Sequence, residues 1–135
     1  MWRDIVRRAQ GYVFTANVPA PYPLQELDLA NRVAVLARQE GWCEDYVRGT
    51  YRRWFIDGHE AGSDVNLMQT LSIGQDKSRV LELAGSPDVE AAYLNQTESA
   101  KRSGIFGSPS FIVDGELFWG DDRLEDALTW ASKEG

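Results

Sequence analysis

The sequence has almost none of the residues that build disulfides or metal centres. It holds one Cys and one His in 135 residues. A single Cys cannot form an internal disulfide, and one Cys with one His leaves almost no ligands for a zinc or iron–sulfur site. We therefore expect no metal site, and a chain without disulfides fits a reducing compartment.

Long apolar runs and excess positive charge are missing as well. The longest apolar run, residues 33–37, is far shorter than the roughly 20 residues that a membrane helix needs. The first residues lack the apolar centre of a signal peptide. A net charge of −7 disfavours nucleic acid, whose binding needs a basic surface. We expect a cytoplasmic protein with neither a nucleic-acid nor a membrane partner.

The residues that are present indicate a folded domain with an uneven charge. Hydrophobic residues make up 43% of the chain and aromatic residues 11%, which is typical of globular proteins. Residues 1–53 contain eight Arg and six acidic residues, whereas residues 54–135 contain six basic and fifteen acidic residues. The basic half is explained either by ion pairs along solvated helices or by a rim that attracts an acidic small molecule.

Most of the chain has helical periodicity. Apolar spacing, Gly stops and capping residues predict six successive helices over residues 2–10, 24–40, 43–56, 64–73, 77–84 and 87–103. Three prolines within residues 12–23 predict an extended loop. The Tyr and Trp side chains between residues 46 and 55 are most simply core.

The pattern changes near the C-terminal end. Residues 110–113 and 116–119 read as two strands joined by Asp114-Gly115, a favoured pair for a two-residue hairpin turn. A last helix is predicted over residues 122–132. Because a lone two-stranded hairpin is marginally stable in water, further strands are expected. They could come from an absent N-terminal segment or from another subunit.

Residues 104–124 contain the groups best suited to bind a ligand. A cis Ser108–Pro109 bond would turn the preceding backbone outward, so that Ser108 could pair with an extended peptide. Asp121 and Asp122 lie at the start of the last helix, where they could hold an ammonium group or simply cap the helix. Trp119 is either core or the wall of a pocket.

This stretch resembles a known family. The blocks Gly104-Ile105-Phe106-Gly107-Ser108-Pro109-Ser110-Phe111 and Asp114-Gly115-Glu116-Leu117-Phe118-Trp119-Gly120-Asp121-Asp122-Arg123-Leu124 are similar to those of the 2-hydroxychromene-2-carboxylate isomerases. These enzymes are relatives of kappa-class glutathione transferases and of DsbA. The resemblance implies an α/β thioredoxin-like fold with an inserted helical domain. Residues 1–103 would be that helical insertion. Residues 104–135 would be the C-terminal ββα part, so this chain would be mostly α with one β-hairpin and a final helix.

The resemblance also implies a glutathione site. Ser108 and Pro109 would contact the cysteinyl part, Asp121 and Asp122 would hold the γ-glutamyl group, and Trp119 would form a pocket wall. Many relatives have Ser or Gln at the position of Asp121. A second carboxylate attracts the ammonium group but repels the α-carboxylate.

One part of the family pattern has no match. The Ser that helps to activate the glutathione thiol has no counterpart here, nor has the N-terminal βαβ unit that carries it, so no catalytic residue is assigned. The implied function is glutathione-dependent cis–trans isomerisation of an aromatic carboxylate in aromatic-compound degradation, by a truncated chain, a homodimer or a chain that needs a partner. The alternatives are a kappa-like glutathione transferase, a DsbA-like oxidoreductase, and a non-catalytic module that binds glutathione or a protein.

Overall fold

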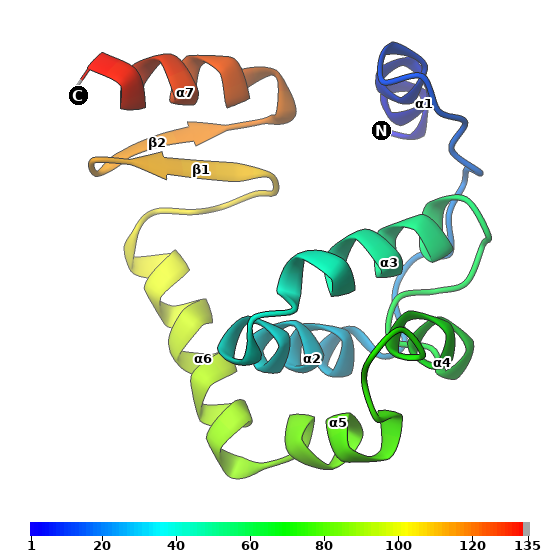
Figure 1. Cartoon of the computed structure of the whole chain (residues 1–135). Helices are drawn as coiled ribbons and strands as arrows, with labels where there is room; N and C mark the ends of the chain where they lie inside the picture. Colours follow the sequence, from blue (N-terminus) through cyan, green and yellow to red (C-terminus); the bar gives the residue numbers. More distant parts are fainter. Residues whose placement is uncertain (134–135) are drawn as a thin grey trace. The chain divides into compact units, whose positions relative to one another are not determined.

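The computed structural model describes residues 1–133, which divide into two compact units. The first unit is Met1–Tyr93, and the second begins at Leu94. The first unit contains α1 (Trp2–Gly11), α2 (Leu27–Glu40), α3 (Cys43–Phe55), α4 (Asp64–Leu71) and α5 (Lys77–Ala84). The next helix, α6 (Pro87–Arg102), contains the point of division (Figure 1).

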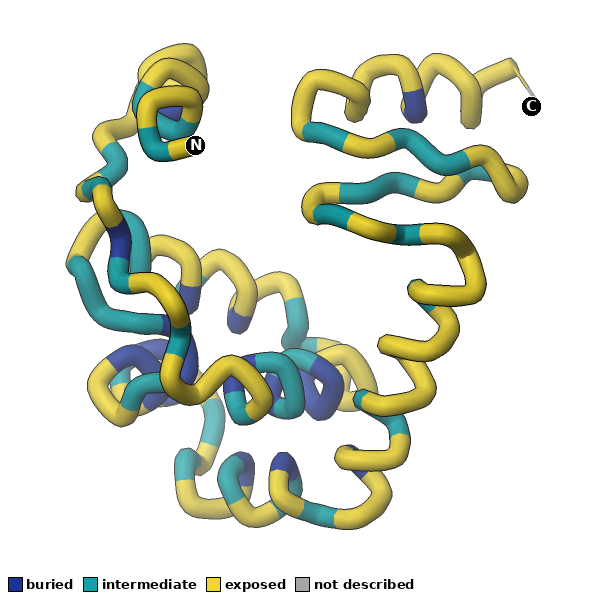
Figure 2. The backbone as a smooth tube through the Cα atoms, turned by 180° about the vertical axis from the view of Figure 1, so that it is seen from behind, coloured by how far each residue is buried: buried dark blue, intermediate teal, exposed yellow. Residues whose placement is uncertain are grey.

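The core of the first unit lies where α2 packs on α3 and α5, and where α3 packs on α4. Figure 2 shows that the buried positions gather on these helices. The periodic apolar positions of α2 include Val33 and Ala37, and both are completely buried. The core is completed mainly by Leu36, Tyr46, Leu67, Leu71, Val80, Ala84 and Val89. Helical spacing of apolar residues is therefore the source of this core.

Capping residues fix where these helices begin and end. The Ser63 hydroxyl accepts a hydrogen bond from the Asn66 N–H at 3.3 Å, and the Asp76 carboxylate accepts one from the Arg79 N–H at 2.7 Å. Both side chains satisfy N–H groups that a helix leaves unpaired at its start. Gly41 ends α2 in the left-handed conformation, with φ of 86°.

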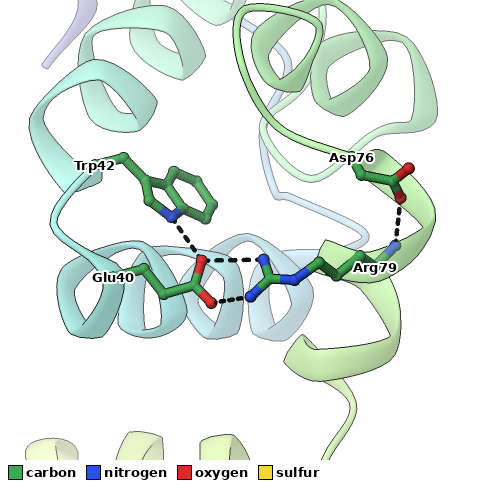
Figure 3. A network of polar contacts seen from close by, with 4 residues as sticks. All are labelled: Glu40, Trp42, Asp76 and Arg79. Atoms are coloured by element: carbon green, nitrogen blue, oxygen red, sulfur yellow. Dashed lines mark hydrogen bonds and ion pairs between the residues drawn. The ribbon is translucent and has the colours of Figure 1, made fainter.

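A polar contact joins the end of α2 to α5 (Figure 3). The Arg79 guanidinium donates two hydrogen bonds to the Glu40 carboxylate, one of them at 3.1 Å, and the Trp42 indole N–H donates a third at 2.8 Å. These hydrogen bonds, with the positive charge of Arg79, hold the pKa of Glu40 below its usual value.

The helix predicted from residue 24 begins later, at Leu27. The backbone N–H of Gln25 donates to the side chain of Glu60, which is 35 residues further along the chain. This tertiary contact holds residues 25–26 in a turn that precedes the helix. The helices predicted over residues 77–84 and 87–103 correspond to α5 and α6 within one residue at each end.

The second unit is built around an antiparallel hairpin. Strands β1 (Ser110–Val113) and β2 (Glu116–Trp119) pair with Phe111 opposite Phe118 and Ile112 opposite Leu117. Asp114 and Gly115 form the turn with φ of 50° and 84°, which suits the tight hairpin that this pair favours. Both strands have the predicted bounds, and the described residues contain no other strand.

A helix follows the hairpin directly. The short helix η1 (Asp121–Arg123) leads into α7 (Leu124–Lys133), which packs on β1. Ala127 is the one buried residue of α7. Among residues 1–133, every helix is too short or too polar to cross a bilayer.

Candidate functional site

The predicted ligand-binding residues meet at one end of the hairpin. The Gly120 N–H donates to the Pro109 carbonyl oxygen at 3.0 Å, next to the pair formed by Ser110 and Trp119. The segment that enters β1 therefore lies beside the segment that leaves β2. The Ser108–Pro109 peptide bond is cis in the structure, and both residues are exposed.

The Trp119 side chain lies against residues 106–107, in the segment that leads into β1. A Cβ atom on Gly107 would collide with the Trp119 Nε1 atom, so only glycine leaves room for the indole in this position. The Phe106 ring lies 5.1 Å from the Trp119 ring between centroids. Trp119 is 54% exposed, so its indole lies at the surface, where it can form a wall for a ligand.

Asp122 folds back over the start of η1. A Cβ atom on Gly120 would stand 2.6 Å from the Asp122 Oδ1 atom, and Gly120 has φ of 114°, where glycine is favoured. Asp121 and Asp122 are both exposed. Gly120 is the N-terminal cap position of η1, and no side chain makes a capping hydrogen bond there, whereas the Asp76 side chain caps α5. An exposed carboxylate beside Gly120 is suited to accept hydrogen bonds from an ammonium group.

Arg123 has a different role from that of the two aspartates before it. Its guanidinium donates to the Asp126 carboxylate at 3.0 Å. This hydrogen bond, with the charges of Asp126 and Asp122, holds the pKa of Arg123 above its usual value. The Arg123 guanidinium thus binds the first turn of α7. Within residues 1–133, no three His, Cys, Asp or Glu side chains cluster in a way that could hold a metal ion.

The first unit contains a hollow that the sequence does not reveal. It has a volume of about 530 Å³ and is lined by α2, α3 and the loop before α2. Tyr46 is core, as predicted, but Tyr51 is 53% exposed and lines this hollow with Trp54. Their spacing on α3 is the same whether they face a core or a cavity, so the sequence offers no signal that separates the two.

Comparisons with known proteins show the family of this chain. A family model described as a DSBA-like thioredoxin domain matches residues 1–129. The 2-hydroxychromene-2-carboxylate isomerase of Sphingobium xenophagum is 29% identical over 126 residues, which are 93% of this chain and 63% of that protein. The isomerase of the same name from Pseudomonas sp. (strain C18) is 26% identical over 138 residues, covering 98% of this chain and 63% of that protein.

A solved structure gives the same fold. A 2-hydroxychromene-2-carboxylate isomerase has a TM-score of 0.78 with this chain at 21% sequence identity, covering 98% of this chain and 64% of that one. The chain thus spans less than two thirds of the length of these relatives. The resemblance to this group and the thioredoxin-like fold class, both predicted from the sequence, are confirmed. The chain belongs to the family of DSBA-like thioredoxin domains.

Proposed function

We propose that the protein binds glutathione and acts in the glutathione-dependent cis–trans isomerisation of an aromatic carboxylate of the 2-hydroxychromene-2-carboxylate type. The observation that supports this proposal best is the convergence of Pro109, Trp119 and Asp122 at one end of the hairpin. Two relatives that carry the name of this isomerase, at 29% and 26% identity, support the reaction class.

The residues at this end of the hairpin fit a peptide that carries an ammonium group. In our proposal, the exposed backbone at Ser108 pairs with the cysteinyl part of glutathione, as in strand addition. The Asp122 carboxylate accepts hydrogen bonds from the γ-glutamyl ammonium, and Trp119 covers the ligand from one side. Asp121 adds a second negative charge, which strengthens attraction for the ammonium and weakens it for the neighbouring α-carboxylate.

Glutathione bound there would supply a thiolate for reversible addition to a conjugated double bond, with the carbon–sulfur bond that forms broken again before release of the isomer. This chain's contribution is to hold and orient the peptide. The group that lowers the pKa of the thiol is proposed to come from a longer form of the chain, from a second copy or from a partner.

Calorimetric titration with glutathione tests the proposal through Asp122. We expect Asp122→Asn to weaken binding about tenfold, because a charge-assisted hydrogen bond becomes a neutral one. Glu116→Gln is the matched control, since Glu116 is an exposed carboxylate at the opposite end of β2. Equal glutathione affinity in the wild type and in Asp122→Asn would remove Asp122 from the site.

A non-catalytic binding module is the second candidate, and exposed apolar side chains favour it. In the second unit, Phe106 is 72% exposed, Leu128 61% and Ile112 45%. Apolar surface of this kind often marks a protein contact. Turnover of 2-hydroxychromene-2-carboxylate with glutathione supports the isomerase. Turnover of a thiol acceptor or a disulfide instead supports a kappa-like transferase or a DsbA-like oxidoreductase, and binding without any turnover supports the module.

A further inference from the structure

The hollow in the first unit has the size and the lining of a small-molecule site. Its volume of about 530 Å³ lies within the range of about 300–1,000 Å³ that is usual for such sites. Its walls are mainly aliphatic and aromatic, and they include the side chains of Tyr22, Leu24, Leu27, Val47, Tyr51 and Trp54. None of the described residues that line it is charged. An ion inside would lose its hydration without gaining a partner, so the walls select for a neutral, apolar ring.

The hydroxyl of Thr50 is the polar group left unpaired at this site. Thr50 lines the hollow, the residue is only 5% exposed, and within the described chain its Oγ1 atom is buried without a hydrogen-bond partner. A buried hydroxyl without a partner is uncommon in folded proteins and destabilises the fold. A polar atom in this state therefore points to a ligand that completes its hydrogen bonding.

The neighbouring polar groups already have partners. The Tyr46 hydroxyl donates to the Ala30 carbonyl oxygen at 2.9 Å. Burial raises the pKa of Tyr46 to about 12, so the phenol stays protonated and donates to Ala30. The Asn31 amide donates to the Tyr93 hydroxyl at 3.3 Å. These contacts hold the polar side of the hollow in place and leave Thr50 to meet a ligand.

We infer that this hollow binds a neutral aromatic molecule, whose ring lies among the apolar side chains and whose hydroxyl or carbonyl oxygen bonds to the Thr50 hydroxyl. All the residues that carry the inference belong to the first unit, whereas the proposed glutathione residues belong to the second. The inference can therefore be tested independently of glutathione binding and isomerase activity.

Two probes of nearly equal shape test the contact with Thr50. The full chain is titrated, without glutathione, with 2-naphthol and separately with 2-methylnaphthalene, in which a methyl group replaces the hydroxyl. Binding is followed by NMR at the indole N–H of Trp54, which donates to the Pro21 carbonyl oxygen at 2.8 Å at the edge of the hollow. We expect both probes to shift this signal in a saturable way.

The variant Thr50→Val keeps the shape of the side chain and removes its hydroxyl. We expect it to weaken 2-naphthol about fivefold while changing the affinity for 2-methylnaphthalene less than about twofold, the scale of one neutral hydrogen bond. The control Thr129→Val, on the exposed side of α7, should leave both affinities unchanged.

A second variant tests the cavity itself. Ala34 lines the hollow, so Ala34→Leu adds bulk inside it and should weaken both probes by about tenfold or more. The absence of saturable binding by either probe would overturn the inference, as would equal losses for both probes in Thr50→Val. Binding of 2-naphthol without any binding of glutathione would leave the inference standing and count against the proposed isomerase.

Discussion

At the scale of single residues, two buried threonines on neighbouring helices differ in what their hydroxyls contact. Thr70 on α4 is 9% exposed, and its hydroxyl donates to the Asn66 side-chain oxygen at 3.1 Å. Asn66 is completely buried and donates in turn to the carbonyl oxygens of Thr50 and His59, at 3.1 and 2.9 Å. The Thr50 hydroxyl has no such partner among residues 1–133. Identical substitutions at the two positions should thus have unequal effects on stability.

We predict that Thr70→Val lowers the free energy of unfolding by about 1–2 kcal/mol, because the buried Asn66 oxygen loses its donor. We predict that Thr50→Val leaves it within about 0.5 kcal/mol of the wild type or raises it, because an unpaired hydroxyl is replaced by a methyl group. Urea denaturation of both variants measures the difference. A loss at Thr50 as large as the loss at Thr70 would show that the Thr50 hydroxyl is paired in solution.

The candidate site was predictable at this scale only where it depends on nearby sequence. Pro109 and Asp122 come together because the Asp114-Gly115 turn fixes the hairpin register, and that turn can be recognised from two residues. The close approach of Trp119 to Gly107 could not be foreseen, because it depends on how one side chain lies across the strands. The role of Thr50 was equally hidden, since a helical Thr gives no sign of a neighbouring cavity.

At the scale of helices and strands, the contact between α2 and α5 makes stability depend on pH. Arg79 hydrogen bonds hold the pKa of Glu40 below the value it has in an unfolded chain, about 4.3. A carboxyl group with a lowered folded pKa stabilises the fold fully above its unfolded pKa. That contribution disappears as the pH falls through the folded pKa.

We therefore predict that Glu40→Gln lowers the free energy of unfolding by about 0.5 kcal/mol at pH 7, where the carboxylate is charged, because solvent screens this exposed pair. The difference from the wild type should shrink below about pH 4.5 as Glu40 takes up its proton. Thermal unfolding at pH 7 and pH 3 measures both. Glu44→Gln is the control, because its ion pair with Arg48 joins two side chains that are 78% and 77% exposed. A difference that persists unchanged at pH 3 would contradict the electrostatic explanation.

The bounds of the helices show where local sequence is no longer sufficient to predict the structure. The start of α5 at Lys77 was predictable because Asp76 caps it through a contact within three residues. The start of α2 was wrong by three residues because the deciding contact comes from Glu60, far along the chain. Caps and turns are local and can be read from the sequence, whereas a distant side chain that binds a backbone N–H cannot.

At the scale of the whole chain, the two units differ sharply in how much they bury. The core cluster belongs entirely to the first unit, whereas Ala127 is the sole buried residue described from Leu94 onward. Burial of apolar surface is the main source of stability, and an isolated two-stranded hairpin has little of it. The sheet of the second unit should therefore open far more often than the helices of the first.

We predict that backbone amides of β1 and β2 exchange with deuterium about a hundredfold faster than those of α2 and α4, which corresponds to ~3 kcal/mol in opening free energy. Hydrogen exchange followed by mass spectrometry measures this on the full chain. If a second copy supplies the strands that the hairpin lacks, protection of β1 and β2 should rise with protein concentration while that of α2 stays constant. Strong protection of the hairpin in dilute monomer would instead mean that the second unit is stable as this chain forms it.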